Sequence, residues 1–250
     1  MTFDREFWTE GPGSFALAIL IALTIRWAFM EAYVIPSGSM LPSLLVHDHI
    51  FVNKFVYGVR VPFTEKWMFE LNEPARGEVI VFKYPENKDL FYIKRVIGVP
   101  GDKVYYENGN LYVNDELVEK VVPTNHKPDF NWLRDKDFAG DGAGATTFYE
   151  HWQEEIGEHD FSILLRKGRG SDSFGPYDVP PNAYFVMGDN RDKSQDSRFW
   201  AEGFTFVPRN NLVGRAMFVW LSCEETLPVV SFLCNPLKLR WKRFFHTVHD

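Results

Sequence analysis

The sequence predicts a mainly β protein, in which an N-terminal transmembrane helix precedes a largely antiparallel β-sheet domain with an inserted subdomain. Short runs of β-branched and aromatic residues, bounded by Gly and Pro, recur along the chain, and 23 of its 250 residues are Phe. Asn108-Gly109 separates two alternating runs, which is a strong hairpin signal. No alternation of strand and helix patterns is visible, so antiparallel pairing is favoured over a parallel sheet.

The segment 14–35 is expected to be a membrane anchor, preceded by a tail at residues 1–13. Residues 15–25 are uninterrupted apolar sequence, and residues 27–30 and 32–35 continue it. Such a segment is long enough for a helix that crosses about 30 Å of hydrocarbon, which takes about 20 residues. The alternatives are a buried core helix and a cleaved signal peptide. The acidic tail and the lack of a small-residue cleavage site argue against the signal peptide, and the tail gives no charge signal for membrane orientation.

Beyond the anchor, we expect a first core part at residues 36–104, an inserted subdomain at 105–183, a second core part at 184–222 and a C-terminal tail at 223–250. Both core parts contain strand-like runs, whereas residues 121–181 are polar, punctuated by glycine and poor in regular period. This change of texture indicates an insertion or a long excursion.

The charges of the chain bear on its binding partners, and its two cysteines bear on disulfide bonding. The net charge of −7 argues against a nucleic-acid partner, because nucleic-acid-binding proteins usually carry a basic surface. The tail PLKLRWKRFFHTVHD is basic and aromatic, so it is either a contact with anionic lipid or a terminal strand with solvated charges. Cys223 and Cys234 form no C-x-x-C pair, and the sequence leaves one disulfide bridge and two free buried thiols equally open.

The stretch VIPSGSMLPSLL, residues 34–45, presents three serines among prolines directly after the anchor. It is either a linker that leaves the membrane or a turn that carries a nucleophile. A serine hydroxyl needs a neighbouring base, and the nearest candidates in sequence are His47 and His49 beside Asp48. A Ser-His-Asp triad is disfavoured, because adjacent residues of a strand point to opposite faces. No histidine spacing typical of a metal site occurs, so no metal and no cofactor are expected.

Lys94 is the other candidate base. It lies mid-strand in FYIKRVIGV, where it shares a face with Tyr92 and Val96, while Arg95 points with Ile93 and Ile97. An amine on an aromatic and aliphatic face is set up for desolvation, which lowers the pKa of a lysine and leaves it neutral. Lysines also often extend from strand edges into water, so the position of Lys94 alone does not show whether it is a catalytic base. A dense polar loop at residues 188–198, after the strand AYFVM, is a further functional candidate.

Together these segments resemble the type I signal peptidases, membrane-anchored Ser/Lys endopeptidases of peptidase family S26. The motifs occur in the family's order: PSGSMLPSL at 36–44, DHIFVNKFVYG at 48–58, YIKRVIGVPGDKV at 92–104, GDNRDKSQDSR at 188–198 and NLVGRA at 211–216. Residues 105–183 show no matching motif. The resemblance implies the signal peptidase fold and a β-rich catalytic domain.

Carried over residue by residue, the resemblance implies that Ser39 is the nucleophile and Lys94 the general base. The oxyanion would be bound by the Ser37 hydroxyl and the Ser39 backbone N–H. Ser194 matches the serine that orients the lysine amine by a hydrogen bond. Two pairs match the family's supports, Asp196 with Arg198 and Asp189 with Arg95. Shallow apolar pockets for the residues before the cleaved bond would be lined by Tyr33, Ile35, Met40, Leu44, Tyr92 and Ile93.

Three features depart from the family's pattern. His47 stands where the family commonly has Gly, the link at residues 199–208 is longer than usual, and no second transmembrane segment is recognisable. The resemblance implies an enzyme that removes signal peptides from secreted preproteins after small residues, with the secretion machinery as a further candidate partner. It also implies a single-pass protein of the bacterial inner membrane, with the catalytic domain on the periplasmic or outer face.

Two rival functions stay open on the sequence alone. One is another Ser/Lys peptidase, of the self-cleaving repressor or conjugation type, which the anchor and the lack of a DNA-binding domain before Ser39 oppose. The other is a non-catalytic membrane-tethered β-domain that binds partners. Such a domain would have no need of Ser39, Lys94 and Ser194 together.

Overall fold

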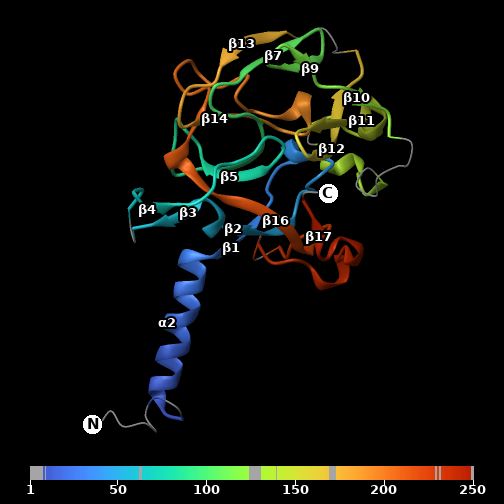
Figure 1. Ribbon diagram of the computed structural model, residues 1–250. Helices are drawn as coiled ribbons and strands as arrows, with labels where there is room; N and C mark the ends of the chain where they lie inside the picture. The colour runs from blue at the N-terminus through green and yellow to red at the C-terminus, as the bar shows by residue number, and fades with distance from the viewer. Residues whose placement is uncertain are drawn as a thin grey trace.

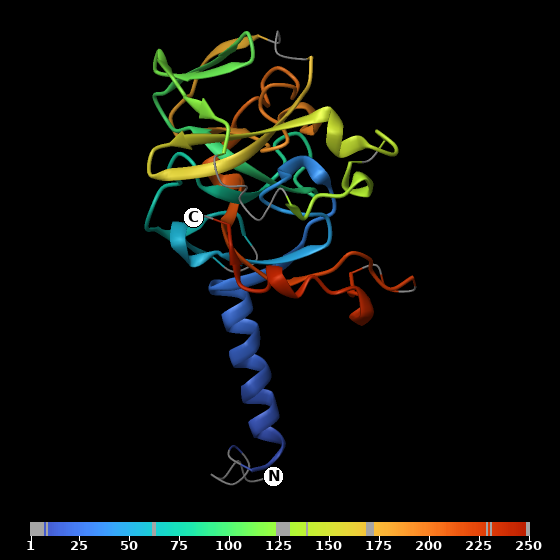
Figure 2. The same ribbon diagram turned by 90° about the vertical axis from the view of Figure 1, so that its right-hand side faces the viewer.

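The computed structural model of the chain describes residues 8, 10–61, 64–123, 131–138, 140–168, 173–228, 230 and 232–248. Most of the expected tail at residues 1–13 therefore lies outside the described residues. One helix projects from a body built of β-strands, and the first and last strands of the chain lie at the end of the body where the helix joins it (Figures 1 and 2).

The helix, α2, runs over Pro12–Ala28 and has 17 residues. Proline near its start costs no helical hydrogen bond, because the first N–H groups of a helix have no partner within it. The expectation of a single helix from residue 14 to residue 35 is wrong in its second part. Residues Met30–Val34 form strand β1, which pairs antiparallel with β2. Among the described residues, no helix combines the length and the apolar character needed to cross a membrane.

The largest sheet is antiparallel and orders its strands β1-β2-β16-β5-β6-β14-β15, with β17 paired to β16. All strand pairs of the described chain are antiparallel, which confirms the predicted pairing. The strands of this sheet are β1 (Met30–Val34), β2 (Asp48–Asn53), β5 (Val79–Lys83), β6 (Phe91–Gly98), β14 (Ala183–Met187), β15 (Val207–Pro208), β16 (Leu212–Ser222) and β17 (His246–Thr247).

In the described part of the chain, three smaller sheets complete the body, with the orders β13-β7-β8-β9, β10-β11-β12 and β3-β4. The polar region whose hydrophobic residues show no regular period contains two long strands. These strands, β11 and β12, have eight residues each and pair with each other. The strands of these sheets are β3 (Gly58–Arg60), β4 (Trp67–Glu70), β7 (Lys103–Glu107), β8 (Asn110–Val113), β9 (Glu116–Leu117), β10 (Lys120–Val121), β11 (Tyr149–Ile156), β12 (His159–Arg166) and β13 (Phe174–Asp178). Short 3-10 helices connect the strands: η1 (Gly38–Met40), η2 (Phe55–Tyr57), η3 (Asp135–Asp137), η4 (Ala145–Phe148), η5 (Arg191–Lys193), η6 (Arg209–Asn211), η7 (Pro236–Lys238) and η8 (Trp241–Arg243).

Strand β5 shows why its sequence is apolar without alternation. Val79 and Val81 pack into one hydrophobic cluster, whereas Ile80 and Phe82 pack into another on the opposite face. A strand that is buried on both faces reads as a continuous hydrophobic run. Its neighbour β6 pairs Lys94 with Ile80, so the lysine is carried into the centre of the sheet.

Candidate active site

Ser39 lies in η1, the single 3-10 turn that follows strand β1, and its side chain is buried. Two bonds from the loop after β14 hold this turn: the Asn190 N–H donates to the Ser39 carbonyl at 3.1 Å, and the Asn190 amide donates to the Gly38 carbonyl at 3.0 Å. Gly38 is required by space, since a Cβ there would lie 2.8 Å from the Asp137 carbonyl oxygen. The turn therefore places the Ser39 hydroxyl against the loop and the central sheet.

The Lys94 amine meets this hydroxyl. Its Nζ lies 2.7 Å from Ser39 Oγ and 3.0 Å from the Ile93 carbonyl oxygen. The Nζ also lies 5.5 Å from the centroid of the Tyr92 ring, which confirms that the two side chains share a face of β6. Lys94 is only 4% exposed. Loss of hydration on burial lowers the pKa of Lys94 from 10.5 to about 8, although the carboxylates of Asp196 and Asp189 partly oppose this effect.

Ser37 lies beside the nucleophile on the exposed side of the turn. Its hydroxyl donates to Ser39 Oγ at 3.4 Å, near the limit of a hydrogen bond. The strand and the turn thus bring Ser37, Ser39 and Lys94 together, as the motif positions predict. An amine of lowered pKa in contact with a hydroxyl, with a second hydroxyl next to it, is suited to activating a serine nucleophile.

The loop after β14 forms a buried ionic support for this group. Arg198 binds the Asp196 carboxylate through two bonds of 2.8 Å, and the Gly188 N–H donates to the same carboxylate at 2.9 Å. Burial opposes ionisation of Asp196, but the Arg198 guanidinium lowers the pKa of this carboxyl below its ordinary value. On β6, Arg95 binds Asp189 through two bonds of 2.8 and 2.7 Å, and both side chains are 1% exposed. Both expected support pairs are therefore formed.

Ser194 lies near the nucleophile but does not bond to the lysine. A Cβ on Gly188 would collide with Ser194 Oγ and lie 2.5 Å from the Ser39 carbonyl oxygen, so Gly188 packs closely against both serines. The Ser194 hydroxyl is buried and lies close to the Asp196 carboxylate, whose pKa it helps to lower. The two acceptors of the Lys94 amine are instead Ser39 Oγ and the Ile93 carbonyl. The expected hydrogen bond from Ser194 to the lysine is absent from this part of the structure.

The residues expected to line apolar pockets fall into two groups. Ile35, Met40 and Leu44 lie in one buried cluster, against which Tyr33 and Ile93 pack. Met40 and Leu44 have no exposed surface, so they can back a pocket but not form its wall. Tyr92 packs instead into the cluster on the opposite face of the sheet, with its ring stacked 4.7 Å from that of Tyr84.

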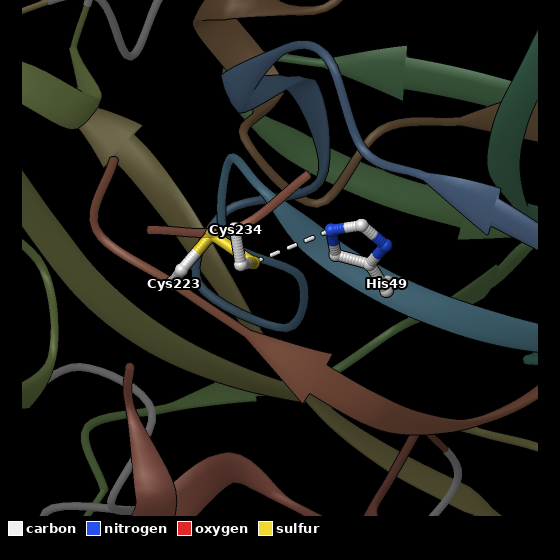
Figure 3. Close-up of side chains that lie close together, drawn as sticks. All are labelled: His49, Cys223 and Cys234. Atoms are coloured by element: carbon white, nitrogen blue, oxygen red, sulfur yellow. Dashed lines mark hydrogen bonds between the residues drawn. A yellow bond between two sulfur atoms is a disulfide. The ribbon is translucent and has the colours of Figure 1, made fainter. Parts of the chain in front are cut away.

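The two histidines near the serines, His47 and His49, occupy other structural positions. His47 has a φ of 67°, a left-handed conformation that favours glycine, which accounts for the Gly expected at this position from the family. His49 Nε2 lies 3.4 Å from Cys234 Sγ, and Figure 3 draws this contact beside the two cysteines. Cys223 and Cys234 form a disulfide, which settles the pairing that the sequence leaves open. The three side chains cluster as metal ligands would, but sulfurs joined to each other offer no thiolates to a metal.

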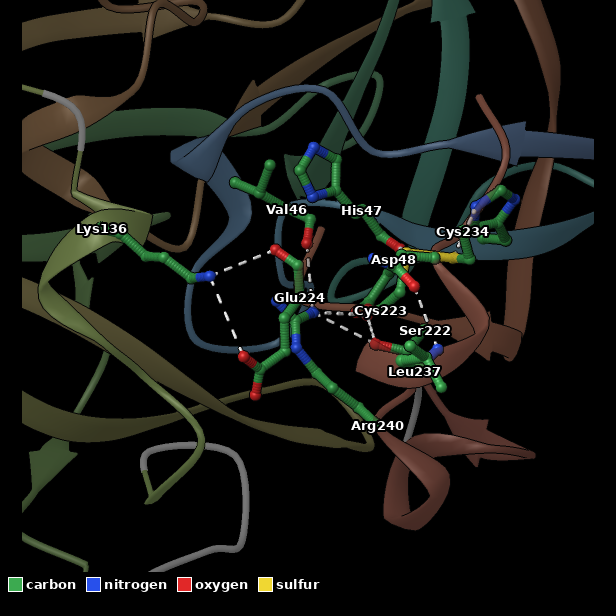
Figure 4. The surroundings of a disulfide bond; sticks show 12 residues. Val46, His47, Asp48, Lys136, Ser222, Cys223, Glu224, Cys234, Leu237 and Arg240 are labelled. Carbon is green, nitrogen blue, oxygen red and sulfur yellow. Dashed lines mark hydrogen bonds and ion pairs between the residues drawn. A yellow bond between two sulfur atoms is a disulfide. The ribbon is translucent and has the colours of Figure 1, made fainter. Parts of the chain in front are cut away.

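Two arginines of the basic tail turn inward, whereas Leu237, Trp241 and Phe245 of the same tail are exposed. Arg243 is fully buried and bonds to Asp48 at 2.6 Å. Arg240 donates to the Val46 carbonyl and to Ser222 Oγ, both at 3.1 Å (Figure 4). These two arginines are therefore not available to lipid. A buried Asp at the start of β2 needs a cation, so Asp48 in the apolar run LLVHDHIFV is the sequence signal that could have indicated this pair.

Comparisons with known proteins find relatives over most of the chain. A family model described as signal peptidase, peptidase S26, matches residues 8–221. Signal peptidase I of Pseudomonas fluorescens is 39% identical over 234 residues, which cover 89% of this chain and 75% of that protein. Signal peptidase I of Rickettsia felis is 34% identical over 228 residues, covering 86% of this chain and 80% of that protein. A crystal structure of a signal peptidase I from Enterococcus faecalis is 25% identical and covers 58% of this chain and 98% of its own, with a TM-score of 0.32, too low to carry weight.

Proposed function

The chain belongs to the signal peptidase family, peptidase S26, and from this premise we propose how its residues perform the reaction. It is a serine endopeptidase that removes N-terminal signal peptides from secreted preproteins. The observation that carries the proposed mechanism is the contact of 2.7 Å between the Lys94 amine and the Ser39 hydroxyl, in a setting where burial lowers the pKa of the lysine to about 8.

In the first step, neutral Lys94 takes the proton of Ser39 as the hydroxyl attacks the carbonyl of the small residue that precedes the cleaved bond. About a tenth of the lysines are neutral at pH 7 if the pKa is about 8, compared with fewer than one in a thousand in water. The negative charge that develops on the carbonyl oxygen is bound by the Ser37 hydroxyl and the Ser39 N–H. The protonated lysine then gives its proton to the leaving amine.

In the second step, water hydrolyses the acyl-enzyme. Lys94, neutral again, takes a proton from the attacking water and returns it to Ser39 Oγ, which leaves as the alcohol. Asp196 with Arg198 and Asp189 with Arg95 hold the surrounding loop and strand in place, and the proposed role of Ser194 is to help orient the amine. Tyr33, Ile35, Tyr92 and Ile93 are the proposed contacts for the residues before the cleaved bond, with Met40 and Leu44 behind them.

The membrane anchor and the location are also part of the proposal. Signal peptidase I is a membrane-associated enzyme of bacteria, and we place this chain in the inner membrane with its β body on the outer face. In support, α2 projects away from the body (Figure 1), and most large apolar side chains on it are exposed: Phe15, Leu17, Ile19, Leu20, Ile21 and Leu23. Its 17 residues span about 25 Å at 1.5 Å per residue, somewhat less than the hydrocarbon core. Membrane lipid and the secretion machinery are the proposed partners beside the preprotein.

Incubation of the detergent-solubilised full chain with a preprotein tests this function. We expect cleavage after a small residue by the wild type, and loss of cleavage in Ser39→Ala and Lys94→Ala with the melting temperature retained. Full activity of Lys94→Ala would refute the dyad. A wild type that cleaves only itself would favour the self-cleaving alternative, and a wild type that binds the preprotein without cleaving it would favour the non-catalytic one.

A further inference from the structure

Ser43 is the third serine of the turn that carries the nucleophile, and the reaction described above does not use it. Its side chain is 7% exposed, which is uncommon for a serine that only caps a surface turn. Ser43 follows η1 in the turn that leads to Asp48, so any bond it makes is transmitted to Ser39 through a short length of chain. The bonds of Ser43 therefore bear on where the nucleophile stands.

The side chain of Ser43 bonds to one buried ion pair. Its hydroxyl donates to Asp189 Oδ2 at 2.5 Å, and Arg95 Nη2 donates to the Ser43 hydroxyl at 3.4 Å. A hydroxyl that donates to a carboxylate at this distance forms a strong, charge-assisted bond. Arg95 is the neighbour of Lys94 on β6, and Asp189 is the neighbour of Gly188 in the loop that contains Ser194. The hydroxyl thus joins the turn of the nucleophile to the strand of the base.

The backbone of Ser43 bonds to a second buried ion pair. Arg243 Nη2 donates to the Ser43 carbonyl at 2.9 Å, and the same guanidinium binds Asp48, with both side chains fully buried. The Leu45 N–H donates to Asp48 Oδ2 at 2.8 Å, so this pair fixes the end of the turn. The Arg243 pair holds the backbone whatever the side chain at position 43, and only the hydroxyl reaches Asp189.

We propose that Ser43 is a positioning residue, whose hydroxyl sets the approach of Ser39 to Lys94 by binding the turn to the Arg95–Asp189 pair. This inference rests on the proposed function, because it concerns the same reaction. Without the hydroxyl, the bonds that remain on the turn are made by its backbone groups, whose side-chain partners are Asn190, Arg243 and Asp48. A misplacement of about 1 Å costs an enzyme about 100-fold in rate, so loss of this one restraint is expected to lower kcat about 10- to 100-fold.

The test compares Ser43→Thr with Ser43→Val, which have the same shape and differ only in the hydroxyl. Cleavage of a preprotein by the detergent-solubilised full chain is measured as kcat and KM, beside the melting temperature of each variant. We expect Thr to retain the wild-type kcat within about threefold, and Val to lose 10- to 100-fold with a KM within about twofold of wild type. Ser43→Ala, which introduces no extra atoms, is expected to match Val and serves if Val does not fold.

Thr147→Val is the control, because it removes an exposed hydroxyl bonded at 2.6 Å to the Gly144 carbonyl, in a 3-10 helix other than that of the nucleophile. This variant is expected to keep the wild-type kcat. Equal kcat values for the Thr, Val and Ala variants of Ser43, with an active wild type, would overturn the positioning role and leave the proposed function intact. A loss confined to KM would also overturn it, since a hydroxyl that places the nucleophile acts on the chemical step. A wild type that leaves the preprotein uncleaved would overturn the proposed function, and the inference with it.

Discussion

Replacement of Lys94 by methionine is expected to make the protein more stable at neutral pH and to abolish cleavage. The two side chains are similar in length, and methionine fills an apolar space without a charge. The fall of the lysine pKa from 10.5 to about 8 corresponds to about 3 kcal/mol against the folded state, at about 1.4 kcal/mol per pH unit. Lys94 is 4% exposed, so solvent screening does little to reduce this cost. The variant also loses two hydrogen bonds, worth about 1 kcal/mol each, and the net gain at pH 7 is about 1 kcal/mol.

The sign of this effect depends on pH. Because burial lowers the pKa of Lys94, the unfolded chain binds more protons than the folded chain between about pH 8 and pH 10.5. Wild-type stability therefore rises with pH across this window, and the full cost of burial is present only below about pH 8. Methionine does not titrate. The variant is thus expected to be more stable than the wild type at pH 7 and less stable at pH 10, with a change of about 2 kcal/mol between the two.

Urea unfolding of the detergent-solubilised chain, followed by tryptophan fluorescence at pH 7 and pH 10, measures this difference. Lys167→Met is the matched control, because Lys167 lies exposed in the turn after β12 and its ammonium stays in water. Its stability relative to wild type is expected to be the same at both pH values. If Lys94→Met shows a pH-independent difference like that of the control, then burial does not lower the pKa of Lys94, and the case for a neutral base at this position is lost.

Three further predictions concern the same site and its surroundings. The rate of cleavage, measured as kcat/KM, is expected to rise through a midpoint near pH 8 as the Lys94 amine loses its proton, and a flat profile between pH 6 and pH 9 would contradict its role as base. Gly188→Ala is expected to lose activity at least about 100-fold, because the added Cβ collides with Ser194 Oγ and with the Ser39 carbonyl; wild-type activity would show that the loop can move away freely. Replacement of Cys223 and Cys234 together by serine is expected to lower the free energy of unfolding by about 2–4 kcal/mol, because the bridge closes a loop of 11 residues; an unchanged urea midpoint would contradict this.

The sequence pattern predicted an element correctly where the physical cause of that element lies in neighbouring residues. The Asn108-Gly109 hairpin is confirmed, with both residues at positive φ between the paired residues Glu107 and Asn110. The alternation around Lys94 is also confirmed, because a strand has only two faces and the side chains of neighbours must point apart. The type of each element followed from spacing alone in these cases.

Local pattern failed where a distant partner decides the structure. Residues 30–34 continue the apolar run of the helix apart from Glu31, but their backbone pairs with β2, so they form a strand. Arg243 and Arg240 read as a basic surface, yet the carboxylate of Asp48 draws them into the interior. The cysteine pairing could not be predicted either, since it requires that two segments bring their Cα atoms to 5.6 Å.

The sequence by itself determined the family, the order of the motifs and the residue types that the reaction needs, because these are written as short runs of neighbouring residues. Only the tertiary structure decided what those residues are chemically. In the sequence, Lys94 is an ordinary lysine. In the folded chain, the sheet, the turn that carries Ser39 and the loop after β14 bury it, and this loss of hydration lowers its pKa to about 8. Ser43 is one hydroxyl among three until folding brings Asp189 to it from 146 residues away.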